Sequence, residues 1–152
     1  MRSTFICLAL LSGLAACGGG DTEVTARLGT PSVEGTWSLS YVQRANDCTG
    51  EGDLFPLAPG DVEIVQDAEQ VTFASRGEEP RTYTVKSTLL TRQLNETVGA
   101  CEATLNETWT LHSVSQSRLS ASYEAKLELS GDCDFTGLRS CAVRHAVWGV
   151  RR

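Results

Sequence analysis

The chain has 152 residues, with 13 basic and 19 acidic side chains and a formal net charge of −6. This acidic balance, with no basic run along the sequence, argues against nucleic acids and anionic lipid surfaces as partners. The length suits a single domain with one buried core.

The first twenty residues have the composition of an export signal. Arg2 is their only charge, and residues 5–16 are almost entirely apolar. That stretch is about half of the ~20 residues that a bilayer-spanning helix needs. A positive start, a short apolar segment and a small-residue exit are typical of a secretory signal, whereas a buried first helix would show an amphipathic stripe.

The exit from this segment, Leu14-Ala15-Ala16-Cys17, resembles the lipobox of bacterial lipoproteins. The resemblance implies removal of residues 1–16 and acylation of both the Cys17 thiol and its new amine. Several acyl chains would hold the protein stably on a membrane, since each buried methylene contributes about 0.8 kcal/mol. No Asp follows Cys17, so by similarity to Gram-negative lipoproteins we expect the outer membrane. A soluble secreted protein cut after Ala16 is the alternative.

Two segments follow the cleavage point. Residues 17–33, which begin with the lipidated cysteine, are small, polar and aperiodic, and we interpret them as a flexible tether. Residues 34–152 form the domain, and their dominant pattern is alternation of apolar and polar side chains. Residues 117–129 are the clearest case, because every second residue from Leu119 to Leu129 is apolar.

Similar alternating runs separated by turn residues predict an all-β fold of short antiparallel strands. We expect a single up-and-down barrel of about eight strands. No Gly or Pro marks a turn at Lys86-Ser87-Thr88, so the fourth and fifth strands could also be one bent strand, giving seven. The predicted strands are 35–44, 61–66, 70–75, 80–87, 89–97, 103–112, 117–129 and 141–149.

The hairpin around Gly99-Ala100 can be predicted in register. With these two residues as a type II′ turn, opposite residues have numbers that sum to 199. Leu90 then faces Trp109, and Arg92 faces Glu107 on the same inward side. A buried charge needs a partner, so we predict an inward-pointing Arg92–Glu107 ion pair.

Gly35-Thr36-Trp37 at the start of the first strand resembles the G-x-W motif of lipocalins and lipocalin-like domains. The resemblance implies an antiparallel barrel whose tryptophan closes one end beneath an arginine from the last strand. An arginine over an indole is favourable by roughly 0.5–2 kcal/mol. The candidates here are Arg144, Arg151 and Arg152.

Four cysteines remain after the signal, and an even count in an exported chain predicts two disulfides. Zinc is the competing interpretation, but the chain has no C-x₂-C pair. In an eight-strand meander all four cysteines lie in or beside the odd-numbered loops, which share one end of the barrel. Short sequence separation favours Cys133–Cys141, which leaves Cys48–Cys101.

Little in the sequence indicates catalysis. Neither His112 nor His145 has an acid or nucleophile at a motif spacing, and no phosphate-binding or dinucleotide motif is present. Residues 132–137, DCDFTG, resemble the front of a calcium loop, but Val143 replaces the required Glu. We therefore expect no enzyme activity, no metal and no cofactor. The apolar residues 54–57 in the first loop predict either a lid over the barrel end or an exposed contact for a partner.

Two function classes remain. The first is a lipid-anchored, lipocalin-like binding module that takes a small apolar ligand in its interior or a protein at its rim. The second is a periplasmic inhibitor or structural interaction protein with a filled barrel, as in bacterial protease inhibitors with small lipocalin-like barrels. The residues expected to contact the interior or a ligand are Trp37, Tyr41, Arg92, Glu107, Trp109 and Tyr123.

Overall fold

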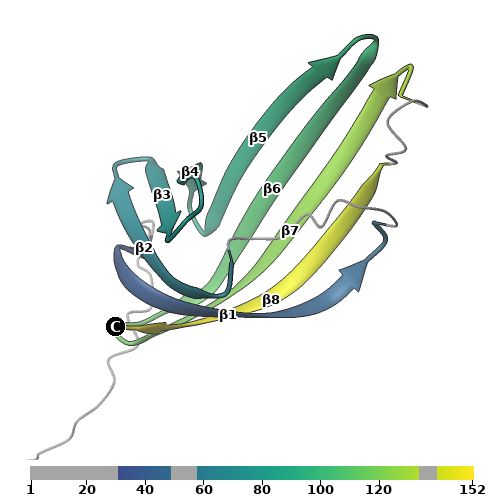
Figure 1. The fold of residues 1–152 in the computed structure, drawn as a ribbon. Coiled ribbons are helices and arrows are strands. Elements are labelled where there is room, and N and C mark those ends of the chain that lie inside the picture. Colours follow the sequence, from purple (N-terminus) through teal and green to yellow (C-terminus); the bar gives the residue numbers. More distant parts are fainter. Residues whose placement is uncertain (1–30, 49–57, 134–139) are drawn as a thin grey trace, which may run out of the picture.

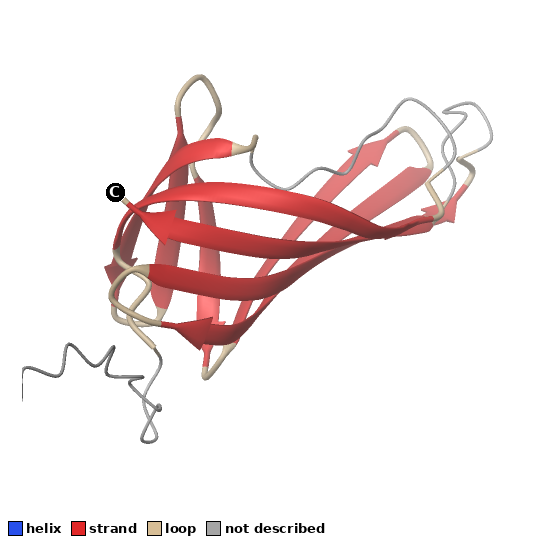
Figure 2. Ribbon diagram, turned by 90° about the horizontal axis from the view of Figure 1, so that it is seen from below, coloured by secondary structure: helices blue, strands red, loops and turns tan. Residues whose placement is uncertain are grey.

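The computed structural model describes residues 31–48, 58–133 and 140–152, which form a closed antiparallel barrel (Figures 1 and 2). The strands pair in chain order and β8 closes onto β1, which confirms the all-β class, the up-and-down topology and the count of eight. The described part of the chain contains no helix, and hence none long and apolar enough to cross a membrane. The strands are β1 (Gly35–Asn46), β2 (Gly60–Asp67), β3 (Gln70–Ser75), β4 (Arg81–Lys86), β5 (Leu89–Val98), β6 (Cys101–Val114), β7 (Arg118–Gly131) and β8 (Cys141–Arg151).

The turn between β4 and β5 explains why the sequence left a seven-strand alternative open. It consists of Ser87 and Thr88, and Ser87 has φ +60°. This left-handed conformation is more often taken by glycine or asparagine, so the usual turn signal is missing. Lys86 nevertheless pairs with Leu89 across a tight hairpin, which makes β4 and β5 separate strands.

The strands are unequal in length, and this divides the barrel into two parts (Figure 1). β1 pairs with β2 only through residues 35–39, and β4 pairs with β5 only through 84–86 and 89–91. We call the part where all eight strands pair the ring. The rest of β5, β6, β7, β8 and β1 continues beyond it as a curved five-stranded sheet, the open sheet (residues 92–98, 101–107, 125–131, 141–145 and 40–46).

Large side chains fill the ring. Its buried aromatic residues are each at most 1% exposed, and they pack with aliphatic side chains from every strand. Trp109 lies at the centre, with ring centroids 5.0 Å from Phe73 and 5.2 Å from Tyr123 in edge-on arrangements that aromatic pairs favour. The fully buried aromatic residues are Trp37, Phe73, Tyr83, Trp109 and Tyr123.

Trp37 closes the ring end in the manner expected from the lipocalin-like motif. The Arg151 guanidinium carbon lies 4.8 Å from the centre of the indole, so Arg151 is the stacking arginine among the three candidates. The indole N–H donates to the carbonyl of Val33 at 2.8 Å, and Val33 is itself 1% exposed. A Cβ at Gly149 would lie 3.3 Å from the Trp37 ring, so the glycine permits this close approach.

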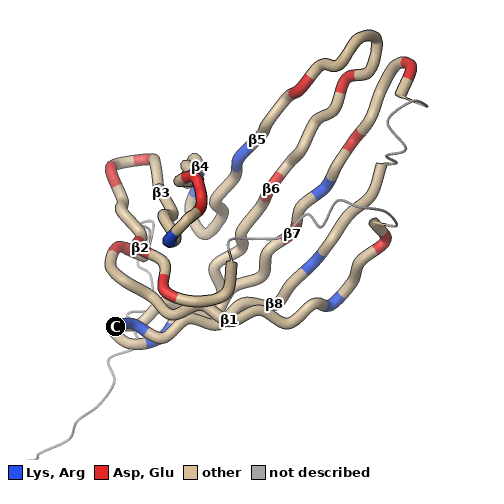
Figure 3. The backbone as a smooth tube through the Cα atoms, in the orientation of Figure 1, with Lys and Arg blue, Asp and Glu red and all other residues tan. Residues whose placement is uncertain are grey.

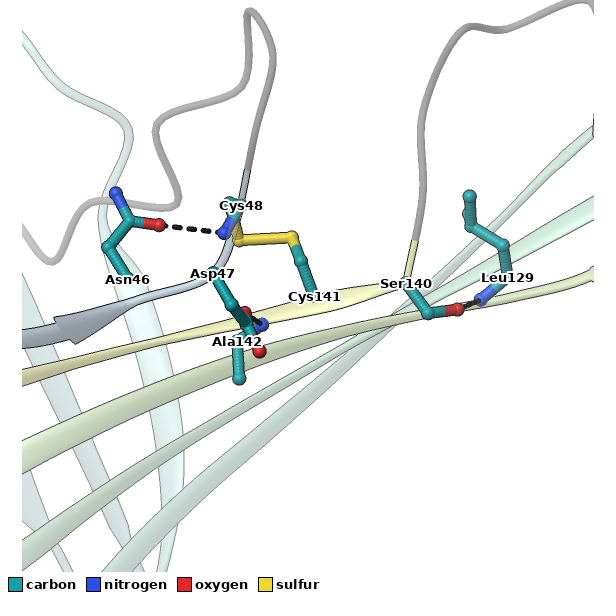
Figure 4. Close-up of a disulfide and its surroundings, with 7 residues drawn as sticks. All are labelled: Asn46, Asp47, Cys48, Leu129, Ser140, Cys141 and Ala142. Carbon is teal, nitrogen blue, oxygen red and sulfur yellow. Dashed lines mark hydrogen bonds between the residues drawn. A yellow bond between two sulfur atoms is a disulfide. The ribbon is translucent and has the colours of Figure 1, made fainter.

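Both predicted disulfides form, but with pairings other than those expected. Cys48 is bonded to Cys141 (Figure 4), and Cys101 is bonded to Cys133. The expectation from short separation was wrong because β7 and β8 pair at Leu127 and Cys141, which leaves Cys133 six residues, or about 20 Å, further along. Neighbouring strands instead bring the partners together, with Cα–Cα distances of 4.9 and 4.7 Å. All four cysteines do share the end of the barrel opposite the Trp37 end, as predicted.

Candidate binding site

A buried carboxylate lies where the ring meets the open sheet. Glu107, on β6, is 1% exposed and points inward. The Arg92 Nη1 atom lies 2.6 Å from one carboxylate oxygen, which confirms the predicted inward ion pair and the register of the β5–β6 hairpin. The other oxygen accepts hydrogen bonds from Arg81 Nη1 at 3.0 Å and from the Tyr123 hydroxyl at 2.7 Å. We call these four residues the Glu107 cluster.

Sequence reasoning missed Arg81, although the signal was present. Arg81 is in phase with Tyr83 and Val85 on β4, and both of these residues point inward. Period-two alternation therefore placed the arginine on the inner face as well. Arg81 was not predicted as a partner of Glu107 because Arg92, directly opposite on β5, already balances the charge of this carboxylate.

The cluster carries excess positive charge because two guanidinium groups share one buried carboxylate. Glu78 offsets part of this charge, with a carboxylate oxygen 3.8 Å from Arg81. The side chains of Arg81 and Arg92 remain 23% and 22% exposed, so both can be reached by solvent. An anionic ligand would have to compete with Glu107 for both arginines.

The tyrosines around the cluster are held in the protonated form. Burial, with a contribution from the Glu107 carboxylate, raises the pKa of Tyr83 to about 12. Burial is also the main cause of the raised pKa values of Tyr41 and Tyr123. All three phenols therefore remain protonated near neutral pH, and the Tyr123 hydroxyl donates to Glu107.

Two of these phenols have unused hydrogen-bonding capacity. The hydroxyl oxygens of Tyr41 and Tyr83 are buried and have no hydrogen-bond partner among the described residues. Tyr41 comes from β1, where its ring lies 6.2 Å from Trp109 and 6.3 Å from His145. The predicted interior residues thus come together around the Glu107 cluster, except Trp37, which lies at the closed end.

Beyond the cluster, the inner face of the open sheet carries accessible apolar side chains, together with Glu96, which lies between Leu94 and Val98 in the same phase of β5. Leu94 and Val98 are in phase with buried Leu90 and therefore face inward, yet they are 42% and 51% exposed. Leu105 and Leu127 continue the same row across β6 and β7 and are partly buried. We call this surface the concave face.

The two histidines and one group of possible metal-ligand atoms lie in different surroundings. His145 is 4% exposed, and burial lowers its pKa, which keeps it neutral. His112 is exposed on the outer side of β6. Asp47, Cys48 and Cys141 bring possible metal-ligand atoms within 4.8 Å of one another, but both sulfurs belong to a disulfide. Cys17, residues 54–57 and most of the calcium-like segment 132–137 lie outside the described residues.

Comparison with known protein families, with curated proteins and with solved structures gives no match. The barrel is compatible with a lipocalin-like domain in strand number and topology. Function must therefore be argued from the site itself.

Proposed function

We propose that this protein is a lipid-anchored, non-catalytic binding protein of the bacterial cell envelope that holds an apolar or amphiphilic ligand against its concave face. The lipobox-like residues ending at Cys17 support the anchor, which we place in the outer membrane. The observation that carries the binding role is that inward-facing Leu94 and Val98 remain about half exposed beyond a filled ring. Accessible apolar side chains on a concave surface are typical of binding sites.

The position of the Glu107 cluster suggests which ligands fit best. Partly exposed Arg81 and Arg92 lie at the base of the concave face, and the buried Tyr41 hydroxyl is within electrostatic range of Arg81. A ligand with an apolar chain could lie along Leu94, Leu105 and Leu127 and direct a polar group toward these donors. A lipid-like amphiphile meets both requirements.

The second candidate is a periplasmic inhibitor or structural interaction protein that takes no small molecule. The packing of the ring favours it, because five buried aromatic residues occupy the space that other eight-stranded barrels keep for a ligand. Such a protein would use its rim, and the concave face would contact a protein partner.

Native mass spectrometry of the protein purified from a Gram-negative host tests the proposal. We expect a co-purifying lipid-like adduct on the wild type and at least a tenfold smaller bound fraction for Leu94→Glu. Leu89→Glu is the matched control, since Leu89 lies on the same strand at 39% exposure but faces outward. A wild type without adduct, or equal loss in both variants, would favour the second candidate.

A further inference from the structure

Charge is unevenly distributed around this barrel (Figure 3). The described residues of β1, β7, β8 and their flanking turns, 31–48, 115–133 and 140–152, carry six basic and five acidic side chains, a net charge of +1. The segment from β2 to β6, residues 60–114, carries four basic and nine acidic side chains, a net charge of −5. Among the described residues, the acidic balance is therefore carried by the β2–β6 side, whereas the β1–β7–β8 side has a slight positive charge.

The outer surface of the β1–β7–β8 side also exposes large apolar residues. Trp148 and Val150 point outward from β8 and are 43% and 57% exposed, and Val42 on neighbouring β1 is 45% exposed. Two cations border them: the Arg44 guanidinium lies 6.0 Å from the Trp148 ring, and Arg118 is directly opposite Val150. We call these five residues the basic face.

The cations of the basic face are available to a partner. Within the described part of the chain, neither Arg44 nor Arg118 forms an ion pair. By contrast, Arg144 and Lys126 on the same side are paired with Glu124 and Glu128. A surface that combines an exposed tryptophan with unpaired arginines suits the boundary between phospholipid headgroups and acyl chains.

The start of the domain brings the basic face close to the proposed anchor. Val150 pairs with Ser38, which lies only five residues after Val33, the last residue of the tether. The tether between Cys17 and Val33 would span roughly 20–25 Å as a coil, so an acylated Cys17 would keep this face near the bilayer at high effective concentration.

We propose that the basic face docks on an anionic phospholipid surface and orients the barrel, with the acidic side turned away. The negative net charge of the chain repels an anionic membrane at long range, but this repulsion does not prevent docking. The anchor keeps the protein near the membrane, and the uneven distribution of charge then favours one orientation. The part of this inference that concerns the anchor rests on the proposed function, whereas the docking itself can be tested without it.

Tryptophan fluorescence can report this contact selectively. The chain has three tryptophans, and Trp37 and Trp109 are 0% and 1% exposed, so only Trp148 is accessible. The chain, as a Gram-negative host exports and processes it, is mixed with vesicles of phosphatidylglycerol and phosphatidylethanolamine that carry brominated acyl chains. Intact mass first establishes whether Cys17 is acylated. An acylated chain is reconstituted into these vesicles and its Trp148 fluorescence is measured. An unacylated chain is assayed by co-sedimentation with the same vesicles.

We expect bromine quenching of the wild type that is absent in Trp148→Phe. Arg118→Glu should lower docking about fivefold or more, because each arginine near an anionic surface has an effect of that size. The matched control is Lys86→Glu, which changes the net charge equally on the outer side of β4 and should leave docking unchanged.

Three outcomes would overturn the inference: an acylated chain whose Trp148 is not quenched, an unacylated chain that does not co-sediment, or equal losses for Arg118→Glu and Lys86→Glu. Self-association through this face without vesicle binding would likewise assign it to a second copy and overturn membrane docking. A missing acyl group with intact vesicle binding would contradict the anchor alone.

Discussion

We expect the loss of the Glu107 carboxylate to lower the stability of the protein strongly, because every other member of the Glu107 cluster contacts it. Replacing Glu107 by glutamine keeps its size but leaves two guanidinium groups without their carboxylate. Removing one partner of a buried ion pair usually costs about 3–5 kcal/mol. Arg81 and Arg92 are about one quarter exposed and can be partly hydrated, so we expect the lower value, about 3 kcal/mol in the free energy of unfolding. For a domain of this size that corresponds to a decrease of roughly 10 °C in Tm.

The contacts also predict an order among variants. Arg92→Met leaves Glu107 with Arg81 and the Tyr123 hydroxyl, so its cost should be smaller, about 1–2 kcal/mol. Glu63→Gln, on the outer face of β2, is the control and should stay within about 0.5 kcal/mol of the wild type. Urea unfolding followed by circular dichroism measures all three. A loss below about 1 kcal/mol for Glu107→Gln, or a larger loss for Arg92→Met, would refute this account of the cluster.

Three further predictions concern titration and packing. Because all three tyrosines have raised pKa values, ultraviolet absorbance should show no phenolate in the folded protein at pH 10 to 11. The free energy of unfolding should decrease as the pH rises above the unfolded pKa of about 10 towards the value of about 12 for Tyr83. Ionisation of the folded protein at about pH 10 would contradict the burial of these residues. Burial lowers the folded pKa of His145, so the stability that its neutral form contributes is present above about pH 6.5 and is lost as the pH falls through the folded value. His145→Gln should flatten this pH dependence in urea unfolding, and an unchanged slope would contradict the effect of burial. Arg151→Met should cost about 1–2 kcal/mol through the lost contact with Trp37, measured by thermal unfolding, and a neutral result would show that the stacking adds nothing.

The strands and one hairpin were predictable because their information is local. Period-two alternation located all eight strands to within about two residues, and the Gly99-Ala100 turn set the β5–β6 register, which in turn placed Arg92 opposite Glu107. Gly99 has φ +63°, as a type II′ turn requires of its first residue. Where a turn residue fixes the register, cross-strand chemistry can be predicted from the sequence.

The disulfides and the stacking arginine depended on how strands meet across the closed barrel. β1 and β8 are far apart in sequence, yet their register places Cys48 beside Cys141 and Trp37 beside Arg151. No turn connects these two strands, so nothing local sets their register. Net charge is likewise an average over the whole chain, so it does not show that the acidic excess lies on the β2–β6 side.

The unequal strand lengths give the Glu107 cluster a structural reason to exist. β4 and β5 stop pairing after Thr91, and Arg92 is the next residue along β5. Backbone hydrogen bonds no longer join the two strands beyond this point, but Arg81 reaches from the start of β4 to Glu107 on β6, and Arg92 meets the same carboxylate from β5. An apolar contact would not span this divergence, whereas long guanidinium side chains can. The cluster therefore links the ring to the open sheet at the place where the barrel wall divides, so the base of the concave face is joined to the buried aromatic residues of the ring.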